Sequence, residues 1–385
     1  MIKDRELLKK IASQQKRHWV RITRACNNNC LFCLDRENQN GSIFSMAEIV
    51  LDLKRGLKEG IRRVVISGGD PTVHPELVEI IRKAKALGYQ HVQIITNGRM
   101  LAYEKFAADL KKAGLDEVTI SLHSHLEKEF EKLTGVRGSY KQALQGLFNA
   151  QKQGFIVSVD IVINKINYKK LKETLQFFMK LGVSEFDLLY PIPFGSAWEN
   201  RKKLFFAPEK AQKELSRAFA LSKNKALFIW TNRLPAQYLE DFEELIQDPI
   251  KIHDEVRGMR SEFMRLVAKG RQLFCKGARC QYCFMQSYCQ DLEKLLAKKV
   301  LNSRERPLCL TEELAGAKKL TTLKLDKNFT LKNFTDFYLK NRYFVKSLRC
   351  KKCKYNNSCQ GAWIEAIRKH GFSILNPKKT KVKNS

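Results

Sequence analysis

The sequence predicts an α/β fold built on a parallel sheet, followed by a smaller region organised by cysteines. Between about residues 18 and 190, short apolar runs rich in β-branched residues alternate with longer amphipathic runs, which is the pattern of parallel strands joined by crossover helices. Later in the chain this alternation stops and cysteines become frequent. The length of 385 residues fits a medium-sized catalytic domain with an appended smaller one.

The expected strands and helices follow one another in a regular order. Strands are expected in HWVRITRA (18–25), RRVVISGG (62–69), HVQIITNG (91–98), DEVTISLH (116–123), FIVSVDIVIN (155–164) and EFDLLYPI (185–192). Helices are expected at 46–59, 75–87, 101–113, 139–153 and 168–181, and several of them end at a glycine, the residue that most easily closes a helix. This order predicts right-handed crossovers in a sheet that is either doubly wound or curled into a barrel.

Both of these arrangements place the functional site at the carboxyl ends of the strands. The unusual residues of the first half of the chain stand at these ends: Cys26, Cys30 and Cys33, then Gly68, Gly69 and Asp70, then 96–98, Ser121, His123, Asn164 and 191–195. We therefore expect one rim to collect them. His123 and His125 could shuttle protons there, although a polar residue at a strand end is more often simply solvated.

The rest of the chain divides into a connection and a cysteine-rich domain. We expect an N-terminal helical extension at 1–17, the sheet domain at 18–200, a helical connection at 201–270 with one strand in ALFIWTN (226–232), and a domain at 271–385 that ends in a basic tail. The core of the last domain looks thin, so bound metal is expected to supply part of its stability. Residues 201–203 are expected in a surface loop, and the aromatic stretch at 328–344 either packs as an amphipathic element or stacks on single-stranded nucleic acid.

The charge balance is strongly basic. Lys and Arg number 71 against 40 for Asp and Glu, which gives a net charge of +31. Such a field attracts nucleic acid, acidic peptides or anionic membranes without specifying any of them, and it could also be no more than a Lys-rich solvated surface. The N-terminus lacks a signal-peptide pattern and no stretch is apolar enough to span a membrane, so we expect a cytoplasmic protein whose cysteines serve metal or redox chemistry.

The run CNNNCLFC places three thiols within one loop directly after the first strand. A 4Fe-4S cluster held by three cysteines keeps one iron open for another ligand, whereas a structural zinc site is closed by four ligands. The spacing alone would also fit a zinc knuckle or three unrelated buried thiols.

With the segments around it, this run resembles the radical SAM superfamily over about residues 18–195. The shared segments are CxxxCxxC with Phe32 before its last cysteine, GGD at 68–70, TNG at 96–98, SLHS at 121–124, LTGVRGSY at 133–140 and VDIVINKIN at 159–167. The resemblance implies a partial (β/α)6 TIM-like barrel in which Cys26, Cys30 and Cys33 bind a 4Fe-4S cluster.

The resemblance also implies how S-adenosylmethionine (SAM) is bound and used. Gly68, Gly69 and Asp70 would contact the methionine amino group of SAM, Ser121 its ribose or carboxylate and Asn164 its adenosine, with Asn97 as a further contact. Asp70 departs from the glutamate that is usual in the family. An electron from a flavodoxin- or ferredoxin-type donor would cleave SAM to a 5'-deoxyadenosyl radical, which abstracts hydrogen from the substrate.

The later cysteines repeat a CxxCxxxxxC pattern at 280–289 and 350–359. This resembles the SPASM or twitch extensions of radical SAM enzymes, which hold one or two auxiliary 4Fe-4S clusters, although Trp363 stands where that family has a further cysteine. Structural zinc and crossed pairing remain alternatives. The simplest grouping is local, in two sets: Cys275, Cys280, Cys283 and Cys289, and then Cys309, Cys350, Cys353 and Cys359.

The sequence leaves the substrate open. By analogy with enzymes that carry this kind of extension, we expect modification of a peptide or protein. The +31 charge favours RNA modification as an alternative, and oxidation of a small molecule is a third possibility. A hypothesis of another class is a zinc-stabilised, non-catalytic nucleic-acid-binding protein.

Overall fold

The computed structural model describes residues 16–305, 307, 309–310 and 321–378. The chain splits into two compact units, the first made of 1–206 with 221–229 and the second of 207–220 with 230–385. Most of the expected N-terminal extension and the end of the basic tail lie outside the described residues. The domain boundaries at 200 and 270 stay predictions; the second unit already includes most of the expected connection.

The first unit is built on the predicted parallel sheet. Within the described residues the sheet has seven strands in the order β1 to β7, without a reversal. A doubly wound sheet reverses its strand order at a switch point, so the sequential order fits a partial barrel, and the predicted α/β fold is confirmed. The strands are β1 (His18–Thr23), β2 (Arg63–Gly68), β3 (His91–Thr96), β4 (Glu117–Ser121), β5 (Ile156–Val162), β6 (Glu185–Leu189) and β7 (Phe228–Asn232).

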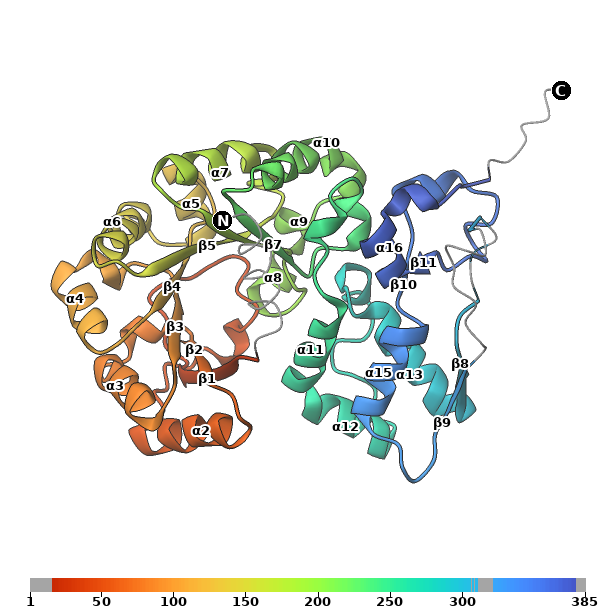
Figure 1. Ribbon diagram of the computed structural model, residues 1–385, viewed down its shortest axis with the longest axis horizontal. Helices are drawn as coiled ribbons and strands as arrows, with labels where there is room; N and C mark the ends of the chain where they lie inside the picture. The colour runs from red at the N-terminus through yellow and green to blue at the C-terminus, as the bar shows by residue number, and fades with distance from the viewer. Residues whose placement is uncertain (1–15, 306, 308, 311–320, 379–385) are drawn as a thin grey trace. The chain divides into compact units, whose positions relative to one another are not determined.

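Helices cover the outer side of this sheet (Figure 1). They are α2 (Met46–Lys58), α3 (Leu77–Leu87), α4 (Glu104–Lys112), α5 (Glu127–Thr134), α6 (Ser139–Lys152) and α7 (Leu171–Lys180). All but α5 were expected. Helix α2 begins with a capping box between Ser45 and Glu48, and α3 ends at Gly88 in the left-handed conformation, as helix-end rules predict.

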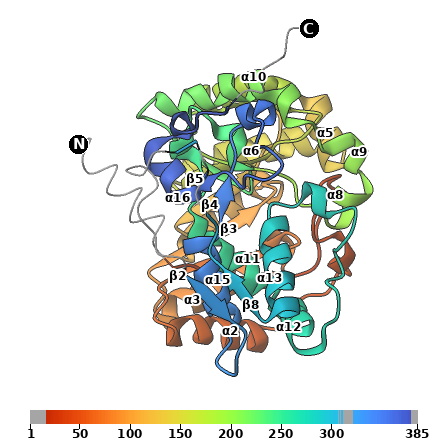
Figure 2. The ribbon, with the colours of Figure 1, turned by 90° about the vertical axis from the view of Figure 1, so that its right-hand side faces the viewer.

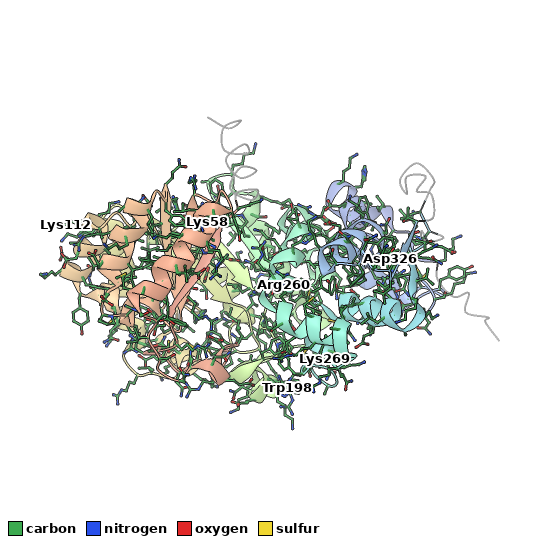
Figure 3. The ribbon with its side chains drawn as sticks, turned by 90° about the horizontal axis from the view of Figure 1, so that it is seen from below. Lys58, Lys112, Trp198, Arg260, Lys269 and Asp326 are labelled. Carbon is green, nitrogen blue, oxygen red and sulfur yellow. The ribbon has the colours of Figure 1, made fainter. Side chains whose placement is uncertain are left out.

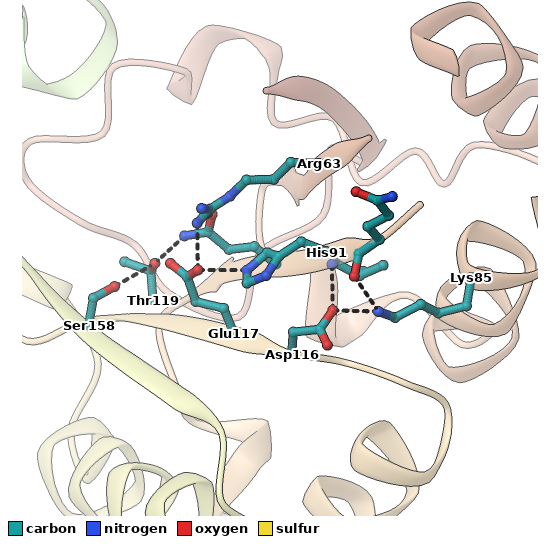
Figure 4. A network of polar contacts seen from close by, with 10 residues as sticks. Arg63, Lys85, His91, Asp116, Glu117, Thr119 and Ser158 are labelled. Atoms are coloured by element: carbon teal, nitrogen blue, oxygen red, sulfur yellow. Dashed lines mark hydrogen bonds and ion pairs between the residues drawn. The ribbon is translucent and has the colours of Figure 1, made fainter. Parts of the chain in front are cut away.

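Alternate strand residues form the core beneath the helices, because side chains alternate between the two faces of a strand. Val64 and Ile66 of β2 and Val92 and Ile94 of β3 are fully buried. The intervening side chains are largely polar and bond to one another across the strands (Figure 4).

This polar network joins four strands on the sheet face that points away from the helices. Arg63 Nη2 donates to Glu117 Oε2 at 2.5 Å and to Gln93 Oε1 at 3.2 Å. Gln93 Nε2 donates to Thr119 Oγ1, and Thr119 in turn bonds to Ser158, each at 2.8 Å. The network satisfies groups that would otherwise be costly to bury.

The second unit is mainly helical. Its helices are α10 (Pro208–Phe219), α11 (Ile252–Gly258), α12 (Arg260–Lys269), α13 (Gln286–Lys298), α15 (Leu331–Asn341) and α16 (Ile364–His370). Two small antiparallel sheets pair β8 (Val300–Asn302) with β9 (Thr322–Lys324) and β10 (Phe344–Val345) with β11 (Ala362–Trp363). Helices α13 and α15 lie side by side in both views (Figures 1 and 2).

Aromatic side chains fill the core between these helices. The ring of Tyr288 on α13 packs edge-on against Phe334 at 5.0 Å and Tyr338 at 5.2 Å on α15, measured between ring centroids. The stretch at 328–344 therefore packs as an amphipathic helix, one of its two expected roles. The expectation of a thin core was wrong, because its members are separated in sequence and meet only in the fold.

A buried carboxylate ties the elements of the second unit together. Asp291 on α13 is fully buried and accepts hydrogen bonds from Arg304 at 3.0 Å and from Arg342 at 2.7 and 2.9 Å.

Among the described residues, no helix has the length and apolarity that crossing a bilayer would need.

Candidate functional site

The three cysteines after β1 lie in a loop that we call the cysteine loop, residues 26–34. One of its sides bonds to the end of α5. The backbone N–H of Asn29 donates to the carbonyl of Thr134 at 2.8 Å, and that of Leu31 donates to the carbonyl of Leu133 at 2.9 Å. Gly135 makes this approach possible, since a Cβ there would lie 2.4 Å from the carbonyl oxygen of Asn29.

The other side of the cysteine loop bonds to α8 (Gly195–Glu199), which follows β6. Ser196 N–H donates to the carbonyl of Cys33 at 2.9 Å, and the side-chain amide of Asn200 donates to the carbonyl of Leu31 at 3.3 Å. Gly195 has φ +50 and sits against the carbonyls of Cys33 and Leu34. The loop is thus held from two sides, by acceptors from α5 and by donors from α8.

The thiols of the cysteine loop interact with one another. Burial raises the pKa of Cys26 to about 11, and the nearby Asp70 charge adds to this. Burial also raises the pKa of Cys30 strongly, and the charges of Cys26 and Cys33 raise it further. The backbone N–H of Asn28 donates to Cys26 Sγ at 3.4 Å. Buried thiols of this kind become thiolate ligands when a cation compensates their charge, so the donor set fits a metal cluster.

No group of three His, Cys, Asp or Glu side chains in the described part of the chain is arranged to hold a single metal ion. In a 4Fe-4S cluster the cysteines are spread over the cube instead of meeting at one ion.

The GGD segment after β2 lies against the start of the cysteine loop. Asp70 N–H donates to the carbonyl of Ala25 at 2.8 Å, and a Cβ on Gly69 would lie 2.1 Å from the same oxygen. The Asp70 carboxylate is buried and accepts from Thr96 Oγ1 at 2.9 Å and from Asn97 N–H at 2.7 Å. The carboxylate therefore connects the loops after β2 and β3. Because it is already bonded there, any contact between this segment and SAM would be made by the backbone of 68–70.

The loop after β3 touches the cysteine loop directly. The Asn97 side-chain amide donates to Asn27 Oδ1 at 2.6 Å and lies 3.9 Å from Cys26 Sγ. Arg99, which the sequence did not single out, donates to the backbone carbonyl of Asn27 and to Asn28 Oδ1. One feature of the sequence could have pointed to Arg99, namely its position directly after the TNG segment.

Among the remaining predicted residues, Ser121 is partly exposed, whereas Asn164 and His123 are buried. Ser121 ends β4 and is half-buried. Asn164 is fully buried, and its side chain bonds to the carbonyl of Val162 at 2.8 Å and to the N–H of Ile166 at 2.9 Å, so it shapes the turn after β5. Burial lowers the pKa of His123 to about 3, which keeps the ring neutral and does not favour a proton-shuttle role.

Residues 20–178 match the Radical SAM superfamily. This part of the chain is therefore a radical SAM domain. The cofactors of this superfamily are a 4Fe-4S cluster and SAM, as predicted. The matched range begins within β1 and ends within α7, and it contains all three cysteines of the cysteine loop.

Curated relatives of this radical SAM domain are named as probable GTP 3',8-cyclases. The one from Saccharolobus solfataricus is 36% identical over 180 residues, 46% of this chain and 58% of the relative. The one from Sulfurisphaera tokodaii is 36% identical over 190 residues, 48% of this chain and 60% of the relative. The chain thus spans less than two thirds of the length of either relative.

Solved structures of other proteins are also similar. Streptococcus suis SuiB bound to S-adenosylmethionine has a TM-score of 0.48 and 14% identity, with 99% of this chain and 80% of that chain covered. The anSMEcpe structure with bound AdoMet and a Kp18Cys peptide has a TM-score of 0.46 and 14% identity, with 56% and 64% covered.

Beyond the radical SAM domain, several of the later cysteines raise one another's pKa. The pKa of Cys289 is raised by burial and then by the charges of Cys283, Cys275 and Cys280. The pKa of Cys350 is raised by burial and then by the charges of Cys309, Cys359 and Cys353. The grouping of these cysteines into two sites stays a prediction.

Proposed function

We propose that Cys26, Cys30 and Cys33 hold the 4Fe-4S cluster of a radical SAM enzyme that reductively cleaves SAM and abstracts a hydrogen atom from its substrate. The observation that carries this proposal is the cysteine loop itself, held by α5 and α8 and touched by the GGD segment and Asn97. Three cysteine ligands leave one iron for SAM. When bound, the cluster and SAM together supply the 5'-deoxyadenosyl radical.

The surrounding side chains then have positioning roles. Asn97 and Arg99 fix the first half of the cysteine loop through Asn27. Phe32 packs edge-on against His123, with ring centroids 4.5 Å apart, and a neutral histidine in this wall adds no charge. An apolar wall of this kind excludes water from a reactive radical.

We further propose that the two cysteine sets of the second unit hold auxiliary 4Fe-4S clusters. The mutual effects of the thiols on one another's pKa support two four-cysteine sites, and structural zinc is the alternative. Anaerobic reconstitution followed by metal analysis separates the two. Three 4Fe-4S clusters require about twelve iron atoms per chain, whereas about four iron atoms together with bound zinc would contradict the auxiliary clusters.

As substrate we propose a peptide or protein, by analogy with other enzymes that have cysteine-rich extensions. A low-potential donor of the flavodoxin or ferredoxin type would supply the electron. A second candidate is a small anionic nucleotide, which is favoured by the relatives named as probable GTP 3',8-cyclases. Those relatives align with less than half of this chain.

The first experiment measures SAM cleavage under reducing, anaerobic conditions. We expect wild-type enzyme to release 5'-deoxyadenosine and the variants Cys26→Ala, Cys30→Ala and Cys33→Ala to release none. Equal release by wild type and variants would remove the main proposal.

The second experiment decides the substrate class. GTP and a peptide library are added separately, and the products are followed by mass spectrometry. Conversion of GTP to a cyclised nucleotide would replace the peptide proposal, whereas SAM-dependent loss of hydrogen from a peptide would support it.

A further inference from the structure

A group of basic residues lies at the carboxyl ends of β5 and β6. We call it the basic rim: Lys165, Lys169, Arg201, Lys202 and Lys203. Lys165 and Lys169 follow β5, and the other three begin α9 (Arg201–Leu204). The expected surface loop at 201–203 is thus a short helix.

Hydrogen bonds and ring packing hold the two segments of the basic rim side by side. Lys165 N–H donates to the carbonyl of Leu204 at 2.7 Å, and Lys165 Nζ donates to the carbonyl of Lys202 at 3.4 Å. Below them the rings of Tyr168 and Phe206 stack with centroids 4.9 Å apart. The basic residues therefore form one surface, although they come from two segments.

The positive charge of the basic rim is not neutralised locally. The side chains of Lys165, Lys169, Lys202 and Lys203 are exposed and form no ion pair with any residue that the structure describes. Elsewhere in this unit several lysines are paired, as Lys85 is with Asp116 at 2.6 Å and Lys152 with Glu104 at 2.6 Å. Unpaired cations that gather on one surface attract an anionic partner.

The basic rim is also close to the cysteine loop. Helix α8 bonds to the carbonyl of Cys33 at its first turn, and Asn200, which bonds to Leu31, immediately precedes Arg201. Helix α8 has five residues and so spans about 7.5 Å. A group bound on the rim would therefore lie within a few residues of extended chain, at about 3.3 Å per residue, from a group held beside the cluster.

We propose that the basic rim binds an acidic segment of the polypeptide substrate, next to the residue that gives up its hydrogen. This inference rests on the peptide substrate proposed above. The acidic residues are expected about two to four positions from the reacting residue, from the span of α8 and the rise of an extended chain.

The aromatic side chains near the rim favour carboxylates over nucleic acid. Proteins that bind single-stranded nucleic acid offer aromatic faces on which bases stack. Here Tyr168 and Phe206 stack on each other, and the Arg201 guanidinium covers the Trp198 ring at 4.4 Å. Arg201 keeps part of its guanidinium for a carboxylate, because within the described part of the chain it donates through Nη1 alone, to the Trp198 carbonyl.

The test is a binding measurement that needs no turnover. Fluorescence anisotropy of the full-length, reconstituted enzyme compares three labelled probes of equal length: a peptide with six glutamates, the same peptide with glutamines, and oligo(U) RNA. We expect the glutamate peptide to bind best and its affinity to fall as salt is raised, since exposed charge pairs are screened.

Matched charge changes locate the binding surface. The rim variant combines Lys165→Glu, Lys202→Glu and Lys203→Glu, and the control variant combines Lys54→Glu, Lys58→Glu and Lys112→Glu on exposed parts of α2 and α4. Figure 3 shows Lys58 and Lys112 well separated from Trp198. Loss of three exposed pairs should raise the Kd of the glutamate peptide about tenfold or more, while the control variant stays within about twofold of wild type.

Two further variants guard against unfolding as an explanation. Replacing the same three rim lysines with arginine should preserve the affinity, and Glu199→Lys, which removes an exposed acid beside the rim, should strengthen it. Equal weakening in the rim and control variants would overturn the proposal. So would equal binding of the glutamate and glutamine peptides, or tighter rim-dependent binding of RNA. Because SAM cleavage is measured separately, a negative binding result leaves the proposed chemistry standing.

Discussion

Replacing Gly195 with alanine should displace the Cys33 end of the cysteine loop. A Cβ at this position would lie 2.6 Å from the carbonyl oxygen of Cys33 and 2.9 Å from that of Leu34. Restoring an ordinary contact of about 3.5 Å requires the loop to withdraw by about 0.9 Å. This exceeds the tolerance of about 0.5 Å within which a functional site keeps its geometry.

The same substitution also costs stability. Gly195 has φ +50, a left-handed conformation that costs other residues about 1 to 2 kcal/mol. We therefore expect Gly195→Ala to lower the free energy of unfolding of the apo chain by about 2 to 5 kcal/mol once the contact with the loop is included. Asn200→Ala removes the amide's hydrogen bonds to the carbonyls of Leu31 and Ser196 and should cost about 2 kcal/mol, at about 1 kcal/mol for each bond.

The assay reads the cluster rather than turnover. Iron per chain, the electron paramagnetic resonance spectrum and the midpoint potential are compared after anaerobic reconstitution of wild type, Gly195→Ala and Gly258→Ala. Gly258 is the control because a Cβ there meets nothing within 4 Å. If Gly195→Ala matches wild type in iron content, spectrum and potential, then α8 does not position the cysteine loop.

Three other substitutions test buried polar groups. Burial lowers the pKa of His123 to about 3, so the folded chain keeps this ring neutral while the unfolded chain binds a proton there below about pH 6.5. The first unit should therefore lose about 2 kcal/mol of stability between pH 6.5 and pH 5. In urea titrations, His123→Gln should abolish this loss and His370→Gln should not. Asp291→Asn should destabilise the second unit by about 3 to 5 kcal/mol, because it removes the buried carboxylate that pairs with Arg304 and Arg342. An effect no larger than that of the exposed Asp254→Asn would contradict this. Asp70→Glu, although closer to the family pattern, should weaken SAM binding and cost about 1 to 3 kcal/mol, since an extra methylene overfills the buried site; unchanged SAM affinity in equilibrium dialysis would show that the carboxylate is free to face the cofactor.

The strands could be predicted because each is a short apolar run bounded by turn residues. The helix α5 was missed because it is short and strongly charged, and only Phe130, Leu133 and Thr134 of its residues are buried. The periodicity of eight residues with so few apolar positions is weak, yet this helix supplies the carbonyls that hold the cysteine loop.

The cysteines and the GGD segment could be singled out from the sequence, whereas the residues that hold them in place could not. The cysteines and the GGD segment are local patterns that can be read from spacing. The role of Asp70 depends on Thr96 and Asn97, which come from another strand, and the role of Asn200 depends on Leu31. Contacts between residues so far apart in sequence follow from the completed sheet and leave no local signal.

The bonding of α8 to the cysteine loop also determines when, during synthesis, the loop can reach its final form. The carbonyl of Leu31 is bonded by Asn200, 169 positions later in the chain, so the finished loop needs β6 and the residues after it. On the ribosome, the three cysteines emerge long before the segment that shapes them. Iron and sulfide delivered to the nascent chain would reach the cysteine loop before the α8 segment that supports it has been synthesised. Cluster insertion is therefore expected to follow synthesis of the whole first unit, and pulse-labelled chains stopped before residue 195 should retain less iron than chains that extend past the first unit.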